Sequence, residues 1–139
     1  MVKTDTISLN TKGFSDVLDI TDKVAGIVKH SGIKNGLVIV FCSGSTGGIT
    51  TIEYESGVIH DLQKAMEKII PSDIPYEHDK RWGDGNGFSH VRAALMKPSL
   101  TIPLVKGNLT LGTWQQIVFI DFDNRRRNRD IIVQVVGDG

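Results

Sequence analysis

The sequence predicts an α+β fold: a mostly antiparallel β-sandwich with two main helices and one short helix. Segments of strand character outnumber segments of helical period. The two kinds alternate irregularly along the chain, which favours an antiparallel sandwich over a doubly wound parallel sheet. The 139 residues contain no internal repeat and no linker-like stretch, so we expect a single domain over residues 1–139.

The first predicted elements are two strands followed by a helix. Residues 6–9 and 14–20 read as strands around a turn at 10–13, and Phe14 is expected on the apolar face of the second strand. Thr21 is expected to cap a short helix, and Gly32 marks the position just beyond its end.

The middle of the chain predicts two strands and the longest helix. Residues 37–41 are continuously apolar and short, which indicates a central strand buried on both faces. A break rich in serine and glycine follows, and residues 49–54 resume as a strand. Apolar residues then recur at helical spacing over 58–70, and Pro71 ends that helix.

A long polar connection and three strands complete the chain. Residues 72–87 are Gly-rich and unusually long for a loop in a compact domain, a feature typical of functional or disordered segments. A short helix is expected near 89–96. The remaining predicted strands are 100–105, 109–123 (bent near Gly112) and 131–136.

The overall composition limits the kinds of binding partner and environment that we expect. Sixteen basic and sixteen acidic residues give zero formal charge, so no global field gathers nucleic acid or an anionic membrane. No apolar run could span a bilayer, and no apolar leader segment is recognisable. The lone Cys42 excludes an internal disulfide framework and fits a reducing, cytoplasmic environment. We therefore expect a cytoplasmic protein that binds neither nucleic acid nor membrane.

Two histidines in segment 76–92 form the principal candidate for a metal site. His78 and His90 lie twelve residues apart across the Gly-rich stretch, and histidine is the commonest metal ligand. A catalytic zinc site needs three protein ligands, so a carboxylate must join them, and Glu53 or Asp84 could do so. Magnesium completed by substrate phosphates is the other possibility. The spacing alone is equally compatible with hydrogen-bonding surface histidines.

Small residues at two places could hold a substrate. Asp84, Gly85, Asn86 and Gly87 can bring backbone N–H groups close to a ligand, although the same residues are common in plain turns. Ser45 and Thr46 could cradle a phosphate through their hydroxyl groups, whereas a tight bend or subunit contact is the alternative.

Arginines supply the candidate anion ligands. Arg92 follows His90 by two residues and suits bidentate capture of phosphate, or else forms a structural ion pair. The basic cluster 125–129 is flanked by acidic residues and lacks interleaved aromatics. It therefore favours a solvated turn or a salt-bridged subunit contact over a nucleic-acid site.

Several of these motifs occur in the order found in one known family. They are GSTG at 44–47, ITTIEYE at 49–55, DGNGFSHVRA at 84–93, PSLTIP at 98–103 and LGTWQQ at 111–116. The chain resembles the archaeal-type version of the YjbQ-like family over nearly its whole length. The resemblance implies a β-sandwich assembled as a homotrimer, a metal bound through histidines, and secondary thiamine-phosphate synthase activity. Gly44 and Phe88 stand where many members carry histidine, which puts that catalysis in doubt.

Two functions follow from these features. The first is a metal-assisted enzyme acting on a phosphorylated small molecule. It would resemble thiamine-phosphate synthase, which joins a pyrimidine diphosphate to a thiazole phosphate, with His90, Arg92 and Glu53 as catalytic residues. The alternative is a non-catalytic trimer that binds a metal or a phosphorylated metabolite. Loss of histidine at Gly44 and Phe88 favours the alternative.

Overall fold

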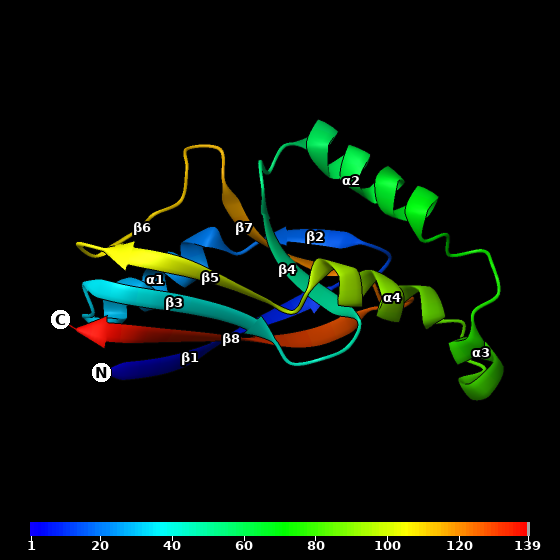
Figure 1. The fold of residues 1–139 in the computed structure, drawn as a ribbon, viewed down its shortest axis with the longest axis horizontal. Coiled ribbons are helices and arrows are strands. Elements are labelled where there is room, and N and C mark those ends of the chain that lie inside the picture. The colour runs from blue at the N-terminus through cyan, green and yellow to red at the C-terminus, as the bar shows by residue number, and fades with distance from the viewer. Residues whose placement is uncertain (139) are drawn as a thin grey trace.

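The computed structural model describes residues 1–138 as two antiparallel sheets with four helices (Figure 1). The larger sheet has the order β1-β8-β3-β5-β6 and the smaller one the order β2-β7-β4. The strands are β1 (Val2–Thr11), β2 (Asp16–Asp19), β3 (Asn35–Cys42), β4 (Gly47–Ile52), β5 (Ser99–Val105), β6 (Asn108–Leu109), β7 (Gln116–Asp121) and β8 (Arg127–Asp138). The helices are α1 (Thr21–Ser31), α2 (Ser56–Ile69), α3 (Glu77–Trp82) and α4 (Gly87–Met96).

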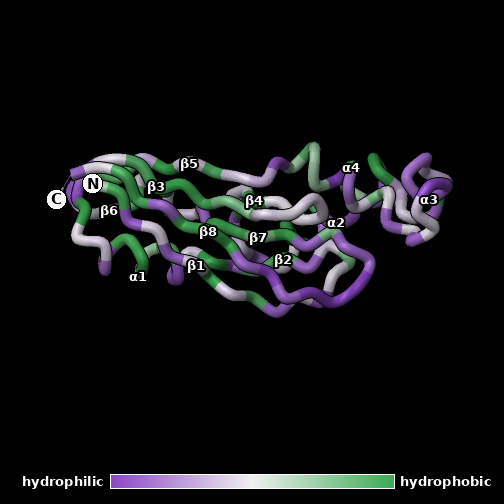
Figure 2. Tube along the Cα trace, turned by 90° about the horizontal axis from the view of Figure 1, so that it is seen from below, coloured by the Kyte–Doolittle hydropathy of each residue, from purple (hydrophilic) through white to green (hydrophobic). Residues whose placement is uncertain are grey.

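The predicted α+β fold of antiparallel strands is confirmed. All strand pairs are antiparallel, and β8 pairs with both β1 and β3. None of the helices within residues 1–138 is both long and apolar enough to cross a membrane. Figure 2 shows hydrophobic strands through the middle of the molecule and a largely hydrophilic α3 at one end.

The connection 72–87, predicted as a long polar loop, contains a helix. The helix α3 places Glu77 in its first turn and Arg81 in its last turn, which suits the helix dipole. Gly83 closes it in the left-handed conformation with φ of 66°. Six residues are too few for a period to emerge from the sequence.

The N-terminal turn lies two residues later than predicted, at residues 12–15. Phe14 and Ser15 both have positive φ, of 53° and 65°, so the strand begins only at Asp16. The ring of Phe14 is 65% exposed rather than on the apolar face. Thr21 does not cap α1; it is the first helical residue, and its hydroxyl donates to Asp19. Gly32 ends the helix in the left-handed conformation, as predicted.

Strand β3 is buried on one face only, so the prediction of burial on both faces was wrong. Val38, Val40 and Cys42 point into the core, whereas Leu37 and Phe41 are 45% and 38% exposed. The inner face packs against α1 and the smaller sheet. No element within residues 1–138 covers the other face, which we call the outer face of the large sheet.

Strand β7 is the shared wall of two hydrophobic cores. The predicted strand 109–123 is interrupted, because residues 110–115 form an irregular loop between β6 and β7. Within β7, Ile117 and Phe119 join the core beneath the large sheet. Val118 and Ile120 face the other way and pack with α2 and α4. This second core fixes the position of α4, which carries His90.

Candidate functional site

The two predicted histidines lie side by side at the junction of α3 and α4. The ring centroids of His78 and His90 are 4.3 Å apart and the ring planes are inclined by 37°. Gly87 permits this close approach, because a Cβ there would lie only 2.5 Å from the Cβ of Tyr76. The Gly87 amide donates to Asp79 Oδ1 at 2.8 Å, which fastens the start of α4 to α3.

Two carboxylates complete a cluster around His78. Its Nδ1 lies 3.3 Å from Asp84 Oδ1 and 3.8 Å from Asp79 Oδ1. One ligand atom from each of the three residues falls within 4.8 Å of the others. The Nδ1 of His78 is buried and has no hydrogen-bond partner among residues 1–138. One imidazole and two carboxylates around a common point form a donor set that fits a divalent cation.

His90 lies beside this cluster rather than within the 4.8 Å group. Burial of its ring, together with the neighbouring His78, lowers the pKa of His90, although nearby aspartates oppose the shift. The imidazole is therefore neutral at pH 7 and able to accept a proton or ligate a metal. Asp84, one of the two carboxylate ligands predicted from the sequence, lies in the cluster. Asp79 also lies in the cluster but was not predicted as a ligand.

The Gly-rich segment 84–87 is held firmly by hydrogen bonds. Asn86 is buried, and its carboxamide oxygen accepts from the Ser89 hydroxyl and from the Asn124 amide. The Asn124 side chain in turn donates to the Asp84 carbonyl at 2.9 Å. Gly85 has a φ of 65°, which glycine adopts without strain. The segment therefore positions Asp84, and Asn86 is part of its scaffold.

Ser45 and Thr46 have different roles. Ser45 is exposed and lines a small cavity of about 210 Å³ that His90 lines from α4. Thr46 is buried, and its hydroxyl donates to Asp123 Oδ2 at 3.0 Å while accepting from Arg129. Only Ser45 can reach a ligand directly.

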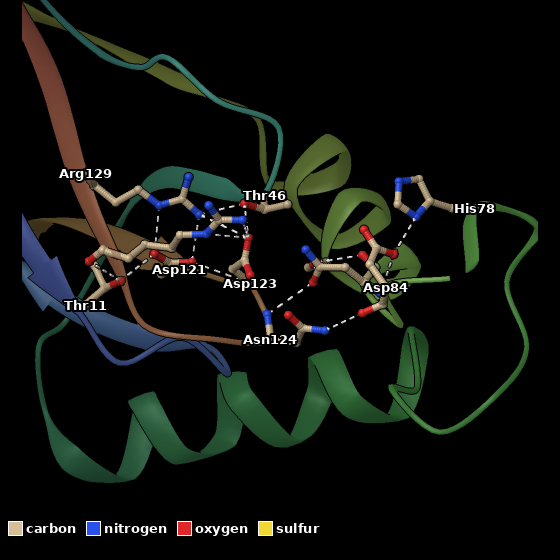
Figure 3. A network of polar contacts seen from close by, with 11 residues as sticks. Thr11, Thr46, His78, Asp84, Asp121, Asp123, Asn124 and Arg129 are labelled. Atoms are coloured by element: carbon tan, nitrogen blue, oxygen red, sulfur yellow. Dashed lines mark hydrogen bonds and ion pairs between the residues drawn. The ribbon is translucent and has the colours of Figure 1, made fainter. Parts of the chain in front are cut away.

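Beneath this loop lies a buried ion-pair network that was not predicted (Figure 3). Arg129 donates from Nε and Nη2 to the two oxygens of Asp121, at 2.8 and 2.9 Å. Asp123 accepts from Arg127 at 3.1 Å. Burial raises the pKa of Asp123, but hydrogen bonds from Thr46, Arg127 and Asn86 outweigh it and lower the pKa. The alternation of Asp121 and Asp123 before the turn with Arg127 and Arg129 after it was the available signal.

The prediction for the cluster 125–129 was therefore wrong for two of its members. Arg127 and Arg129 form ion pairs within the chain, because they alternate on β8 toward the buried aspartates of the neighbouring segment. Arg125 and Arg126 are exposed and make no ion pair within residues 1–138.

Two predicted catalytic residues lie away from the histidines. Arg92 is on the opposite side of α4 from His90, because residues two apart on a helix point about 200° from each other. Its guanidinium donates to the Ile70 carbonyl and to Glu67 Oε2, at 2.7 Å each. Of the two roles considered for Arg92, anion capture and a structural ion pair, the structure shows the ion pair. Glu53 is exposed beyond the end of β4, roughly 20 Å along that strand from the Gly47 end.

Comparisons with known proteins agree with this fold. Residues 5–138 match the family described as UPF0047 protein YjbQ-like. A UPF0047 protein of Methanothermobacter thermautotrophicus is 40% identical over 136 residues, covering 98% of this chain and 93% of the relative. The UPF0047 protein YugU of Bacillus subtilis is 30% identical over 95% of this chain and 98% of its own. A crystal structure of a YbjQ-like protein from Sulfolobus solfataricus superposes with a TM-score of 0.94, at 32% identity and 99% coverage of both chains.

Proposed function

The chain belongs to the YjbQ-like family, and on this premise we propose that it binds a divalent metal ion at His78, Asp79 and Asp84 and acts there on a phosphorylated small molecule. The observation that carries the proposal is the buried Nδ1 of His78, which faces two carboxylates and lacks a hydrogen bond within residues 1–138. An imidazole in that position needs either a proton or a cation to satisfy it. Zinc and magnesium are the two candidate ions.

The residues around the cluster suit a phosphate-bearing ligand. A bound divalent ion would supply Lewis-acid neutralisation of phosphate oxygens. Ser45, which lines a cavity together with His90, has an exposed hydroxyl that can donate to such an oxygen. His90 is held neutral beside it, so its imidazole can accept a proton from a reacting group. The activity would resemble that of thiamine-phosphate synthase, in which a pyrimidine diphosphate is joined to a thiazole phosphate.

A second candidate function is binding without catalysis. Arg92 and Glu53, two of the three predicted catalytic residues, are not beside the histidines. His90 is then the one predicted catalytic group that remains at the site. A site with so few reacting groups also suits a protein that only holds a metal or a phosphorylated metabolite.

We further propose that the chain assembles as a homotrimer through the outer face of the large sheet. Cross-strand register puts Leu37 beside Val136, and Phe41 beside Ile132, on that face. Exposed apolar side chains on adjacent strands are typical of subunit interfaces. Val2 and Val105 extend the patch at its edges.

The test of the metal site is direct. After equilibration with zinc or magnesium, the wild type should bind close to one equivalent. His78→Ala and Asp84→Asn should each weaken binding by at least about 100-fold, since each removes a ligand. His30→Ala on the remote helix α1 is the matched histidine control, and Glu53→Gln should also bind normally. Unchanged metal content in His78→Ala would refute the site.

Turnover then separates the two candidate functions. Metal-loaded protein is mixed with a pyrimidine diphosphate and a thiazole phosphate, and pyrophosphate release is followed. Release that depends on both substrates and on His90 supports the enzyme. Stoichiometric metal binding without pyrophosphate release supports the binding protein.

A further inference from the structure

A second cavity, of about 330 Å³, lies on the opposite side of α4 from the histidines. It is bounded by α2, by α4 and by the turn that precedes β2. Arg92, the buried arginine that sequence analysis assigned to the histidine site, lines this cavity instead. The cavity is of the size that takes a small metabolite.

Helix α2 presents one polar face to the cavity. His60, Gln63, Lys64 and Glu67 recur at the spacing of three and four residues that places side chains on one face. Glu67 is neutralised by its ion pair with Arg92. Lys64 makes no ion pair with any residue in 1–138, so one positive charge at the cavity is uncompensated.

Arg92 adds a buried donor. Its side chain is 4% exposed, and four hydrogen bonds occupy Nε, Nη2 and one of the two N–H groups of Nη1. The second N–H of Nη1 has no partner within residues 1–138. A buried guanidinium N–H and an unpaired ammonium group that line one cavity are suited to a carboxylate or phosphate oxygen.

Two aromatic rings wall the same cavity. Phe88 is buried beneath the Arg92 guanidinium, which lies 4.8 Å from the ring centroid. Phe14 is 65% exposed, although it occupies a left-handed conformation that disfavours a bulky side chain. That conformation is held by backbone bonds from Phe14 to Asp123 and from Ser15 to Asp121, at 2.7 and 2.8 Å. A strained turn that exposes a phenyl ring at the edge of a charged cavity points to a ligand.

We propose that this cavity binds a small aromatic anion, with its carboxylate or phosphate group on Lys64 and Arg92 and its flat body against the exposed ring of Phe14. The proposal does not depend on the metal site, because none of the cavity residues belongs to the cluster of His78, Asp79 and Asp84. The ring of Phe14 supplies the apolar contact, and the two cations supply the charge.

Benzoate and phenyl phosphate are suitable probes, with phenol as the neutral analogue. Titration followed by NMR should give saturable binding of at least one anion, about tenfold or more tighter than phenol, since one charge-assisted contact is worth about that factor. The stronger of the two anions identifies the acidic group. Lys64→Met should weaken binding at least about fivefold, and Lys68→Met, also on α2 but not lining the cavity, should leave it unchanged.

A second variant removes the aromatic wall without straining the backbone. Phe14→Gly suits the positive φ and should fold at least as stably as the wild type, yet bind the anion less tightly. His78→Ala should bind it as the wild type does, which separates this site from the metal site. The proposal is overturned by an absence of saturable binding at tens of millimolar. It is equally overturned by binding that neither Lys64→Met nor Phe14→Gly weakens, or by binding lost in His78→Ala.

Discussion

Replacing Asp121 by asparagine tests whether the buried ion-pair network stabilises the fold. The Asp121 carboxylate is fully buried and accepts four hydrogen bonds, from Thr11, from two nitrogens of Arg129 and from the Asp123 amide, at 2.6–3.0 Å. Asparagine keeps the volume but removes the charge and turns one acceptor into a donor. Removing one partner of a buried pair costs about 3–5 kcal/mol. We expect about 3 kcal/mol, because the remaining oxygen still accepts hydrogen bonds.

For a chain of this length, that loss lowers the melting temperature by about 10 °C. The free energy of unfolding is measured by urea titration followed by circular dichroism, at one fixed protein concentration because assembly would also change stability. Asp130→Asn is the matched control: this aspartate is exposed, accepts from Ser8 and should matter by less than about 0.5 kcal/mol.

A double-mutant cycle isolates the pair. Arg129→Met alone should be destabilising, because it leaves Asp121 buried without its cation. The combination with Asp121→Asn should cost less than the sum of the two single changes, with a coupling energy of at least about 1.5 kcal/mol. A loss below about 1 kcal/mol in Asp121→Asn, or additive effects in the double variant, would refute the structural role argued for this network.

Two further predictions concern pH and assembly. The pKa of His90 is lowered by burial and by His78, so the unfolded chain takes up this proton first as the pH falls. Proton uptake at His90 therefore favours the unfolded chain, and it lowers the free energy of unfolding as the pH drops below about 6.5, the usual imidazole pKa. Urea midpoints between pH 8 and pH 5 should decline less in His90→Gln; parallel profiles would contradict this. The proposed trimer should be visible by sedimentation at micromolar concentration, and Phe41→Lys, which puts a charge on the outer face, should yield monomer. A monomeric wild type would refute the trimer.

Strands and helices with a strong pattern were predictable from the sequence. The apolar run of β3 and the helical spacing of α2 both gave the correct element, and Gly32 marked the end of α1. The burial of β3 on one face could not be predicted, since a continuous apolar run does not reveal which side a partner covers. The prediction for Phe14 was wrong for another reason: its left-handed conformation is set by hydrogen bonds to residues more than a hundred positions away.

The site was predictable in part. His78, His90 and Asp84 were identified from residue type and proximity in sequence, and they lie together. Arg92 is turned away because it follows His90 by two residues on one helix; the predicted helix near 89–96 contains both residues, so this divergence could have been inferred from the sequence. The ion pair between Asp121 and Arg129 was not predicted, because it depends on strand register across a turn, which composition does not reveal.

Strand β8 has a consequence for how the chain is made. It lies between β1 and β3, so the large sheet has a gap until β8 is in place, and its pairing with β1 joins Val2 to Val136. On a translating ribosome, β8 emerges after every other strand described here. The edge of β3 that pairs with β8 must therefore remain unpaired for about ninety residues of further synthesis. Completion of the large sheet should therefore be a late step of folding, because β1 and β3 are joined only through β8.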